Sequence, residues 1–268
     1  MNAPTSPLLD VQGLTIAAAS GQILVRDVSF TVQPGQTLGI VGESGSGKSL
    51  TCRAVLGLLP PGLRLTAGSV QWRGQELTLA SPPAYRKLRR EAWGAVFQDP
   101  GSYLNPSSRI GYQLAECVRV RTGVKGRAAH EAALALLESV GINEPAHVSR
   151  KFPHELSGGM LQRVLIAMAL SGTPLLLIAD EVTTALDVVV QHQVVTLLAE
   201  HKRQRGLAML MVSHDLALVS QVCDALMVMK DGVVVEQGPR SQVLAQPQHA
   251  YTRMLIDTHL KYGLNAYD

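Results

Sequence analysis

The sequence has little excess charge of either sign and few cysteines. Its 24 Lys and Arg residues are nearly balanced by 21 Asp and Glu residues, and the net charge of +3 is too small to indicate a nucleic-acid partner. The one concentrated basic run, Arg86–Arg90, is typical of a solvated helix face. Cys52, Cys117 and Cys223 are odd in number and widely spread, which disfavours a disulfide framework. Reduced thiols in a cytoplasmic compartment are therefore expected.

Long hydrophobic segments are also missing. The apolar stretches 164–170 and 175–179 are separated by SGTP and fall short of the about 18 residues that a membrane-spanning helix needs. The start, MNAPTSPLLD, has neither the basic nor the apolar region of a secretory signal, and no internal repeat is apparent. With 268 residues, 46% of them hydrophobic, the chain can bury a full core. We expect a soluble protein that can dock on a membrane protein.

A glycine-rich stretch, GESGSGKS at Gly42–Ser49, fits the phosphate-loop pattern GxxxxGK[ST] at every fixed position. It lies between an apolar run, 37–41, and a helix-like segment, 50–59. A strand that feeds a glycine-rich turn at a helix start directs several N–H groups and the positive end of the helix dipole at one point. The loop therefore predicts a polyphosphate site, whose backbone and side-chain groups come from Gly42, Ser44, Gly45, Gly47, Lys48 and Ser49. Lys48 can reach the β and γ oxygens, and the Ser49 hydroxyl can ligate Mg²⁺.

Two further stretches carry chemistry. LLLIADE, at 175–181, is an apolar strand that ends in Asp180 and Glu181, two carboxylates at the sheet edge where ligands of open α/β folds bind. Asp180 is expected to hold Mg²⁺ and Glu181 to polarise the attacking water. LSGGM, at 156–160, places Ser157, Gly158 and Gly159 at a helix start and predicts a second anion-binding end.

The remaining pattern predicts an α/β fold. Alternating residues at 8–17 and 23–32 indicate a β-hairpin, and short apolar strands at 175–179, 208–212 and 225–229 alternate with helices, as in a parallel sheet covered on both faces. From 111 to about 170 the pattern is helical, with Ala132, Leu136 and Val140 expected on one buried stripe before Gly141. Asp231-Gly232 predicts a hairpin turn, and a last helix is expected near Ser241.

Six motifs in register resemble the nucleotide-binding subunits of ABC transporters over essentially the whole chain. They are GESGSGKS, LSGGMLQR and LLLIADE, with Gln98 after a strand, Asp187 in TTALD and His214 in VSHD. The resemblance implies a P-loop NTPase core with a mostly parallel sheet, an antiparallel β subdomain and an inserted α-helical subdomain. It implies one nucleotide-binding domain over 1–268, with the helical subdomain at about 105–172 and a C-terminal helical extension at 240–268.

The same resemblance implies a site shared between two subunits. Ser157–Gly159 would contact the γ-phosphate of ATP bound by a partner subunit, and Asp187 would lie across the dimer interface. Gln98 would ligate Mg²⁺ or water and report nucleotide state to membrane subunits, and His214 would contact the γ-phosphate. The implied partners are a second, probably different ATP-binding subunit, two permease subunits and an extracytoplasmic solute-binding protein, with the chain peripheral on the cytoplasmic face of the membrane.

A finer resemblance and two departures qualify this interpretation. VFQDPGSYLNP and VEQGPRSQVLAQPQHAYTRMLI are similar to the dipeptide, oligopeptide and nickel importer branch, and THLKYG with Leu161 to its nickel and metal-chelate members. Val182 stands where the family usually has proline, and 16–20, IAAAS, lacks the usual adenine-stacking aromatic residue. Two alternatives stay open: a soluble ABC-type ATPase acting on DNA or ribosomes, and a non-hydrolysing subunit of an asymmetric pair.

Overall fold

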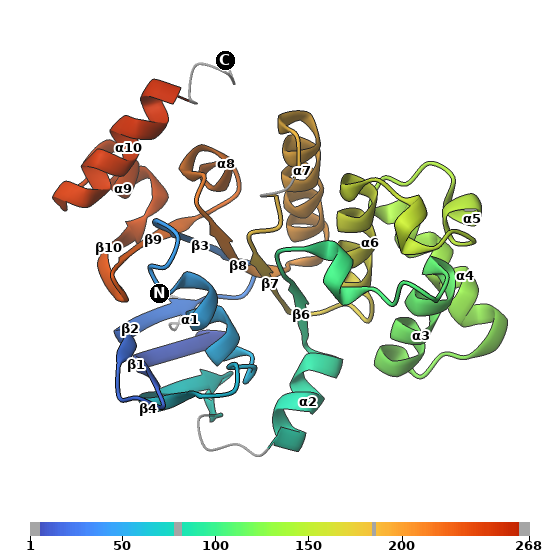
Figure 1. Ribbon diagram of the computed structural model, residues 1–268, viewed down its shortest axis with the longest axis horizontal. Helices are drawn as coiled ribbons and strands as arrows, with labels where there is room; N and C mark the ends of the chain where they lie inside the picture. The colour runs from blue at the N-terminus through green and yellow to red at the C-terminus, as the bar shows by residue number, and fades with distance from the viewer. Residues whose placement is uncertain (1–5, 78–81, 184–185, 263–268) are drawn as a thin grey trace, which may run out of the picture. The chain divides into compact units, whose positions relative to one another are not determined.

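The computed structural model describes residues 6–77, 82–183 and 186–262, and the chain divides into two compact units (Figure 1). The first unit combines residues 1–86 with 208–268, and the second comprises residues 87–207. The phosphate-loop motif and His214 belong to the first unit. Gln98, LSGGM, Asp180, Glu181 and Asp187 belong to the second.

The first unit contains an antiparallel sheet in the order β2-β1-β4-β5. Its strands are β1 (Leu9–Ala18), β2 (Ile23–Val32), β4 (Leu63–Trp72) and β5 (Gln75–Glu76). The predicted hairpin is confirmed, since β1 pairs with β2 through a turn in which Gly21 has a φ of 89°. Alternate residues of β1 and β2, such as Val11, Val25 and Phe30, are buried, as expected for strands with one face toward a core.

The first unit also contains the parallel strands that carry the phosphate loop. These are β3 (Thr37–Val41), β8 (Ala208–Ser213) and β9 (Ala225–Lys230), and β10 (Val233–Pro239) runs antiparallel to β9. β3 pairs in parallel with β8 on one side and β9 on the other. Every residue of β3 and β8 is buried, which explains their continuous apolar runs. Asp231 and Gly232 both have positive φ in the predicted β9–β10 turn.

Four helices lie in the first unit, and α2 (Pro82–Glu91) spans the boundary between the units. They are α1 (Lys48–Val55), α8 (Leu216–Ser220), α9 (Arg240–Ala245) and α10 (Ala250–Tyr262). α10 packs against α8 and β10 (Figure 1). The helix expected near Ser241 is α9, and α10 follows it after residues 246–249, where Pro247 lacks the N–H that a continuing helix needs.

The second unit combines two parallel strands with a group of helices. The strands are β6 (Trp93–Val96) and β7 (Leu176–Asp180). The helices are α3 (Ile110–Thr122), α4 (Gly126–Ser139), α5 (Pro145–Val148), α6 (Gly158–Leu170) and α7 (Val188–Arg205), with 3₁₀ turns η1 (Pro100–Tyr103) and η2 (Pro153–Glu155). α3 and α4 pack against each other and both pack on α6 (Figure 1).

The buried stripe of α4 differs from the predicted one. Ala132 and Leu136 are half-buried, whereas Ala129, Ala133 and Leu137 are buried together with the following Val140. The predicted stripe is displaced by one residue along the sequence. Alanine and leucine occur on both sides of this helix, so that composition does not distinguish the inward face. Gly141 follows the helix with a φ of 73°, in agreement with its predicted capping position.

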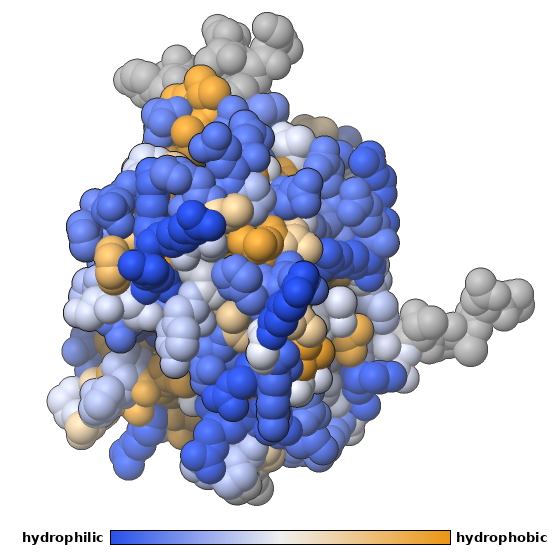
Figure 2. Space-filling view, turned by 90° about the vertical axis from the view of Figure 1, so that its right-hand side faces the viewer, coloured by the Kyte–Doolittle hydropathy of each residue, from blue (hydrophilic) through white to orange (hydrophobic). Residues whose placement is uncertain are grey.

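Within the described ranges no helix is both long and apolar enough to cross a membrane. The face drawn in Figure 2 is mostly hydrophilic, with hydrophobic side chains in small, separate groups. Among the described cysteines, Cys52 and Cys223 are buried and Cys117 is half-buried.

Candidate functional site

The phosphate-loop motif connects β3 to α1 as the sequence predicts. Lys48 is 3% exposed, and its ammonium group donates to the carbonyl oxygens of Gly42 at 2.8 Å and Glu43 at 2.7 Å. Gly47, which caps α1, has no side chain, and the described first turn of α1 contains no acidic residue. An uncapped helix start next to a buried cation is suited to an anion, because the N–H groups and the helix dipole both favour negative charge.

Close approach of the backbone explains the first glycine of the loop. Gly42 has a φ of 149°, and a Cβ there would lie 2.1 Å from the carbonyl oxygen of Met229 on β9. At Gly45, by contrast, no described atom lies within 4 Å of the Cβ position, although its φ of 84° still favours glycine. The loop is therefore fixed at its start by packing on β9, while its tip at 43–45 is exposed.

His214 lies at the same sheet edge as the phosphate loop. Val41 of β3 and Ser213 of β8 are paired in parallel, so that Gly42 and His214 follow neighbouring strand ends. His214 is exposed, and the next residue, Asp215, caps α8 by accepting from the N–H of Leu218 at 3.0 Å. The first unit thus brings together two of the predicted groups, the phosphate loop and His214.

The second unit brings Gln98, Asp180 and Glu181 to one sheet edge. β6 and β7 run parallel with Val96 paired to Ala179, so that Gln98 and Glu181 each lie two residues beyond a paired position. Asp180 is 3% exposed, and Glu181 is half-buried with a φ of 51°, a conformation that is uncommon for a non-glycine residue. Two carboxylates and an amide thus follow the carboxyl ends of adjacent strands.

Thr183 and Leu186, which follow Glu181, are bound by a helix that the motifs did not single out. Gln191 of α7 donates from its side-chain amide to the carbonyl oxygens of Thr183 at 2.9 Å and Leu186 at 3.2 Å. Val182, which replaces the usual proline, is 3% exposed and packs into the core. Burial therefore holds Val182, and hydrogen bonds to Gln191 hold Thr183 and Leu186. The effect of Val182 on hydrolysis stays a prediction.

The helix start predicted at LSGGM is formed, while its role in binding an anion stays a prediction. Ser157 caps α6 by accepting from the N–H of Met160 at 3.3 Å, and both Ser157 and Gly158 are exposed. A Cβ on Gly159 would lie 2.8 Å from Cγ1 of Val190 on α7, so that the starts of α6 and α7 are adjacent. Asp187 caps α7 through the N–H of Val190 at 3.0 Å, and it is followed by the exposed Val188 and Val189. These residues form one surface, which we call the α6/α7 face.

Arg163 fixes the orientation of α6. Its guanidinium donates to the carbonyl oxygen of Val140 at 2.7 Å and to the side-chain oxygen of Gln193 at 2.6 Å. It therefore links α6 to the end of α4 and to α7. Arg163 belongs to the LSGGMLQR motif, but its role as a connection between three helices could not be read from the motif alone.

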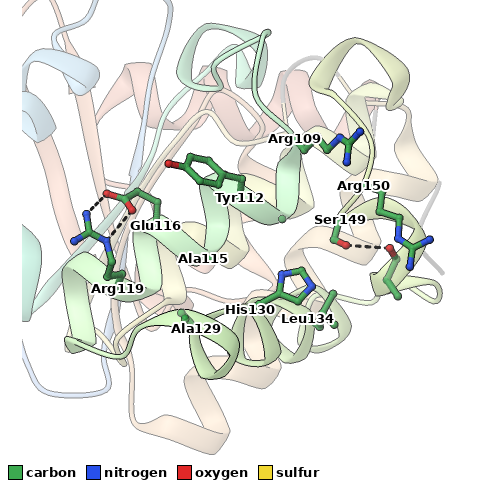
Figure 3. A pocket seen from close by; sticks show the side chains of 13 residues that line it. Arg109, Tyr112, Ala115, Glu116, Arg119, Ala129, His130, Leu134, Ser149 and Arg150 are labelled. Atoms are coloured by element: carbon green, nitrogen blue, oxygen red, sulfur yellow. Dashed lines mark hydrogen bonds and ion pairs between the residues drawn. The ribbon is translucent and has the colours of Figure 1, made fainter.

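One cavity of the second unit is separate from these residues. It measures about 610 Å³ and lies among α3, α4 and α5 (Figure 3). Its lining is mostly apolar, and the polar side chains that contribute to it include Arg109, Tyr112, Glu116, Arg119, His130 and Arg150. Glu116 and Arg119 are paired with each other, and the hydrogen bond from Arg119 lowers the pKa of the Glu116 carboxyl. None of the predicted nucleotide-binding residues lines this cavity.

The geometry of the first unit defines an α/β nucleotide-binding protein of the phosphate-loop class. The sequence pattern of the ABC transporter family matches residues 25–184. The chain belongs to this family. The predicted α/β fold and the predicted family are both confirmed.

Curated relatives cover nearly the whole chain. The chain is 44% identical to the oligopeptide transport ATP-binding protein OppD of Salmonella typhimurium over 95% of its length and 76% of that protein. It is 38% identical to the metal-staphylopine import system ATP-binding protein CntD of Staphylococcus aureus, over 95% of the chain and 94% of that protein. It is also 44% identical to the peptidoglycan transport ATP-binding protein YejF of Agrobacterium fabrum, but spans only 47% of that protein's length.

Solved structures share the fold. CbiO1 of Clostridium perfringens, part of the ABC transporter complex cbiONQ, has a TM-score of 0.78 and 27% identity, with 96% of each chain covered. The ATP-binding cassette MJ0796, solved as a dimer bound to ADP and Pi, has a TM-score of 0.77 and 25% identity, with 87% of this chain covered. The chain is thus an ABC-type ATPase of the transport class.

The two glycines of LSGGM, Gly158 and Gly159, should respond differently to replacement by alanine. Gly159→Ala is expected to lower the free energy of unfolding by about 1 to 3 kcal/mol, because its Cβ meets the stiff side chain of Val190. Gly158→Ala, with no described atom within 4 Å of its Cβ position, is the matched control and should be as stable as the wild type. Urea unfolding measures both; equal destabilisation would contradict the close packing of α6 on α7.

Proposed function

We propose that this chain binds ATP on its phosphate loop and hydrolyses it with Glu181 to energise import across a bacterial membrane. The observation that carries the proposal is the buried ammonium of Lys48, held by the carbonyls of Gly42 and Glu43 at an uncapped helix start. In such a position Lys48 supplies a fixed positive charge to the β and γ oxygens of the nucleotide. The N–H groups of the loop surround the same oxygens.

The proposed metal site draws on oxygen donors alone. Ser49 contributes a hydroxyl, Gln98 an amide oxygen and Asp180 a carboxylate, a donor set that suits Mg²⁺ and disfavours softer metals. The position of Asp180 at the carboxyl end of β7, where ligands of open α/β sheets bind, supports its use as a metal ligand. When bound, Mg²⁺ neutralises charge that develops on the phosphates.

Glu181 and His214 are proposed to act on the reacting atoms. The Glu181 carboxylate takes a proton from the attacking water as the water oxygen bonds to the γ-phosphorus, while the bond from this phosphorus to the bridging oxygen breaks and ADP leaves. His214 contacts the γ-phosphate and positions the water. The uncommon backbone conformation of Glu181 supports a functional role, since strained conformations cluster at active sites.

A second ATP-binding subunit is proposed to cover the α6/α7 face. Ser157 and Gly158 are exposed at the start of α6, while Val188 and Val189 are 57% and 67% exposed beside Asp187. Exposed apolar residues next to an anion-binding helix start support a surface that contacts both a partner protein and its nucleotide. Ser157–Gly159 then completes the partner's site, and Asp187 lies at the interface between subunits.

The cargo and the remaining partners follow from the relatives. OppD and CntD are named for oligopeptide transport and metal-staphylopine import, so we propose uptake of a nickel or other metal chelate, or of a di- or oligopeptide. Two permease subunits and a solute-binding protein complete the proposed transporter, which would place this chain on the cytoplasmic face of the membrane. Action on DNA or ribosomes is disfavoured, because these relatives are named as transport or import proteins.

We propose the following domain organisation. One nucleotide-binding domain extends over residues 1–268, with a helical subdomain at about 105–172 and a C-terminal helical extension at 240–268. The group of helices α3 to α6 supports the first of these two boundaries, and α9 and α10 support the second. The helical subdomain carries the α6 part of the α6/α7 face.

Lys48→Ala should weaken ATP binding by at least about tenfold, because removal of a buried charge-assisted contact costs roughly 1.5 to 3 kcal/mol. Equilibrium titration with a fluorescent ATP analogue measures the dissociation constant. Lys87→Ala removes an exposed lysine of α2 and is the matched control. An unchanged dissociation constant in Lys48→Ala would argue against the phosphate loop as the nucleotide site.

Glu181→Gln should retain ATP while lowering kcat by at least roughly a hundredfold, since the amide polarises water poorly. Single-turnover ATPase measurements on the assembled transporter test this, with Glu200→Gln, an exposed glutamate of α7, as the control. Hydrolysis at the wild-type rate in Glu181→Gln would refute the assigned role. If the wild-type chain itself fails to hydrolyse ATP in this complex, the non-hydrolysing alternative holds.

Cargo is tested with the transporter reconstituted in vesicles. A solute-binding protein loaded with the correct cargo should stimulate ATPase activity several-fold above the empty protein, because closure of the ATPase dimer is coupled to the permease. A nickel chelate and an oligopeptide are compared as cargo. Stimulation by neither would contradict both proposed substrate classes.

A further inference from the structure

The C-terminal helix α10 contacts the phosphate loop directly. The Tyr251 hydroxyl accepts a hydrogen bond from the backbone N–H of Glu43 at 3.0 Å. Tyr251 is only 5% exposed, although Glu43 lies at the exposed tip of the loop. The two residues are 208 positions apart in the sequence and belong to the same compact unit.

The peptide group between Gly42 and Glu43 is consequently held at both ends. Its carbonyl oxygen, on Gly42, accepts from the Lys48 ammonium at 2.8 Å, and its N–H, on Glu43, donates to Tyr251. A rotation of this peptide would break both hydrogen bonds and turn the carbonyl away from Lys48. Gly42, with a φ of 149°, has no side chain that would resist such a rotation.

Tyr251 is itself fixed by its surroundings. The carboxylate of Glu236 on β10 accepts from the N–H groups of Gln248 at 2.8 Å and His249 at 3.0 Å, which anchors the segment leading into α10. The Lys230 ammonium lies 5.0 Å from the centre of the Tyr251 ring, within the range of a cation–π contact. Burial raises the pKa of Tyr251, so that the hydroxyl keeps its proton at neutral pH.

The β9–β10 turn supports the loop from the same side. The N–H of Gly232 donates to the carbonyl oxygen of Ser46 at 3.2 Å, and the carbonyl oxygen of Met229 lies against Gly42. The residues C-terminal to β8 therefore contact the loop at Gly42, Glu43 and Ser46, whereas the Lys48 ammonium binds it from within. Tyr251 is the part of this support that comes from a helix beyond the sheet.

We propose that Tyr251 is a positioning residue for ATP binding, which holds the Gly42–Glu43 peptide so that its carbonyl stays directed at Lys48. This inference rests on the proposed function, because it assumes that Lys48 receives the phosphates of ATP. The C-terminal extension is then part of the nucleotide site as well as an addition to the fold.

The test is Tyr251→Phe in the full-length chain, which removes the hydroxyl and keeps the ring. The dissociation constant for ATP should rise roughly three- to tenfold, the effect of one lost hydrogen bond that positions the loop. Tyr112→Phe, the same change at a residue that is 71% exposed on α3, should leave the constant unchanged. In the assembled transporter, KM for ATP should rise while kcat stays within about twofold.

A merely structural role would lower the melting temperature of Tyr251→Phe without a change in ATP affinity, and that result overturns the inference. If wild-type protein fails to bind ATP, the proposed function fails instead, so that the two failures are distinguishable. Amide hydrogen exchange on the wild-type chain provides a measurement that needs no variant. The Glu43 amide should exchange at least roughly tenfold more slowly than in an unfolded chain, and an unprotected amide would contradict the hydrogen bond to Tyr251.

Discussion

The ammonium of Lys48 is almost completely withdrawn from water and is held by carbonyl oxygens of the loop that precedes it. A buried cation is costly unless polar groups surround it, so the loop must keep those carbonyls directed inward. Neighbouring segments hold the loop in this arrangement. β9 closes against Gly42, the turn at Gly232 binds Ser46, and Tyr251 holds the outer side of the Gly42–Glu43 peptide. Because the loop is fixed in advance, little ordering is left to be done when phosphates bind.

In the second unit, the helix start that we propose to bind phosphate is exposed. Ser157 caps α6 and yet remains exposed with Gly158, while Val188 and Val189 leave apolar surface uncovered beside it. An enclosed site would bury these groups. Their exposure is consistent with our proposal that each subunit carries its own phosphate loop and supplies its α6/α7 face to a neighbour. In that arrangement, the pair of subunits is the functional unit.

The sequence predicted the strands and the phosphate loop well, because both depend on local patterns. β3 is a continuous apolar run before a glycine-rich turn, and the bounds predicted for it agree with the structure. The register of β3 with β8 then brings His214 to the predicted edge. The inward face of α4 was one position out, because small apolar residues surround that helix.

Contacts between distant segments could not be predicted in this way. Nothing in the pattern around Tyr251 indicates that its hydroxyl meets a backbone N–H 208 residues earlier. Gln191 likewise lies on a helix whose periodicity gives no sign that its amide holds the turn after Glu181. Both are hydrogen bonds from a side chain to the backbone of another segment, so they depend on tertiary packing. The assigned roles of the nucleotide-binding residues remain predictions.

ATP binding and turnover by the isolated wild-type chain, measured with Mg²⁺, test the shared site most directly. Calorimetric titration should give saturable binding of one ATP per chain, while turnover under the same conditions stays slow because the partner's α6/α7 face is missing. Absence of saturable binding would contradict the phosphate loop as a preformed site. Turnover as fast as that of the assembled transporter, at concentrations where the chain is monomeric, would contradict the shared site.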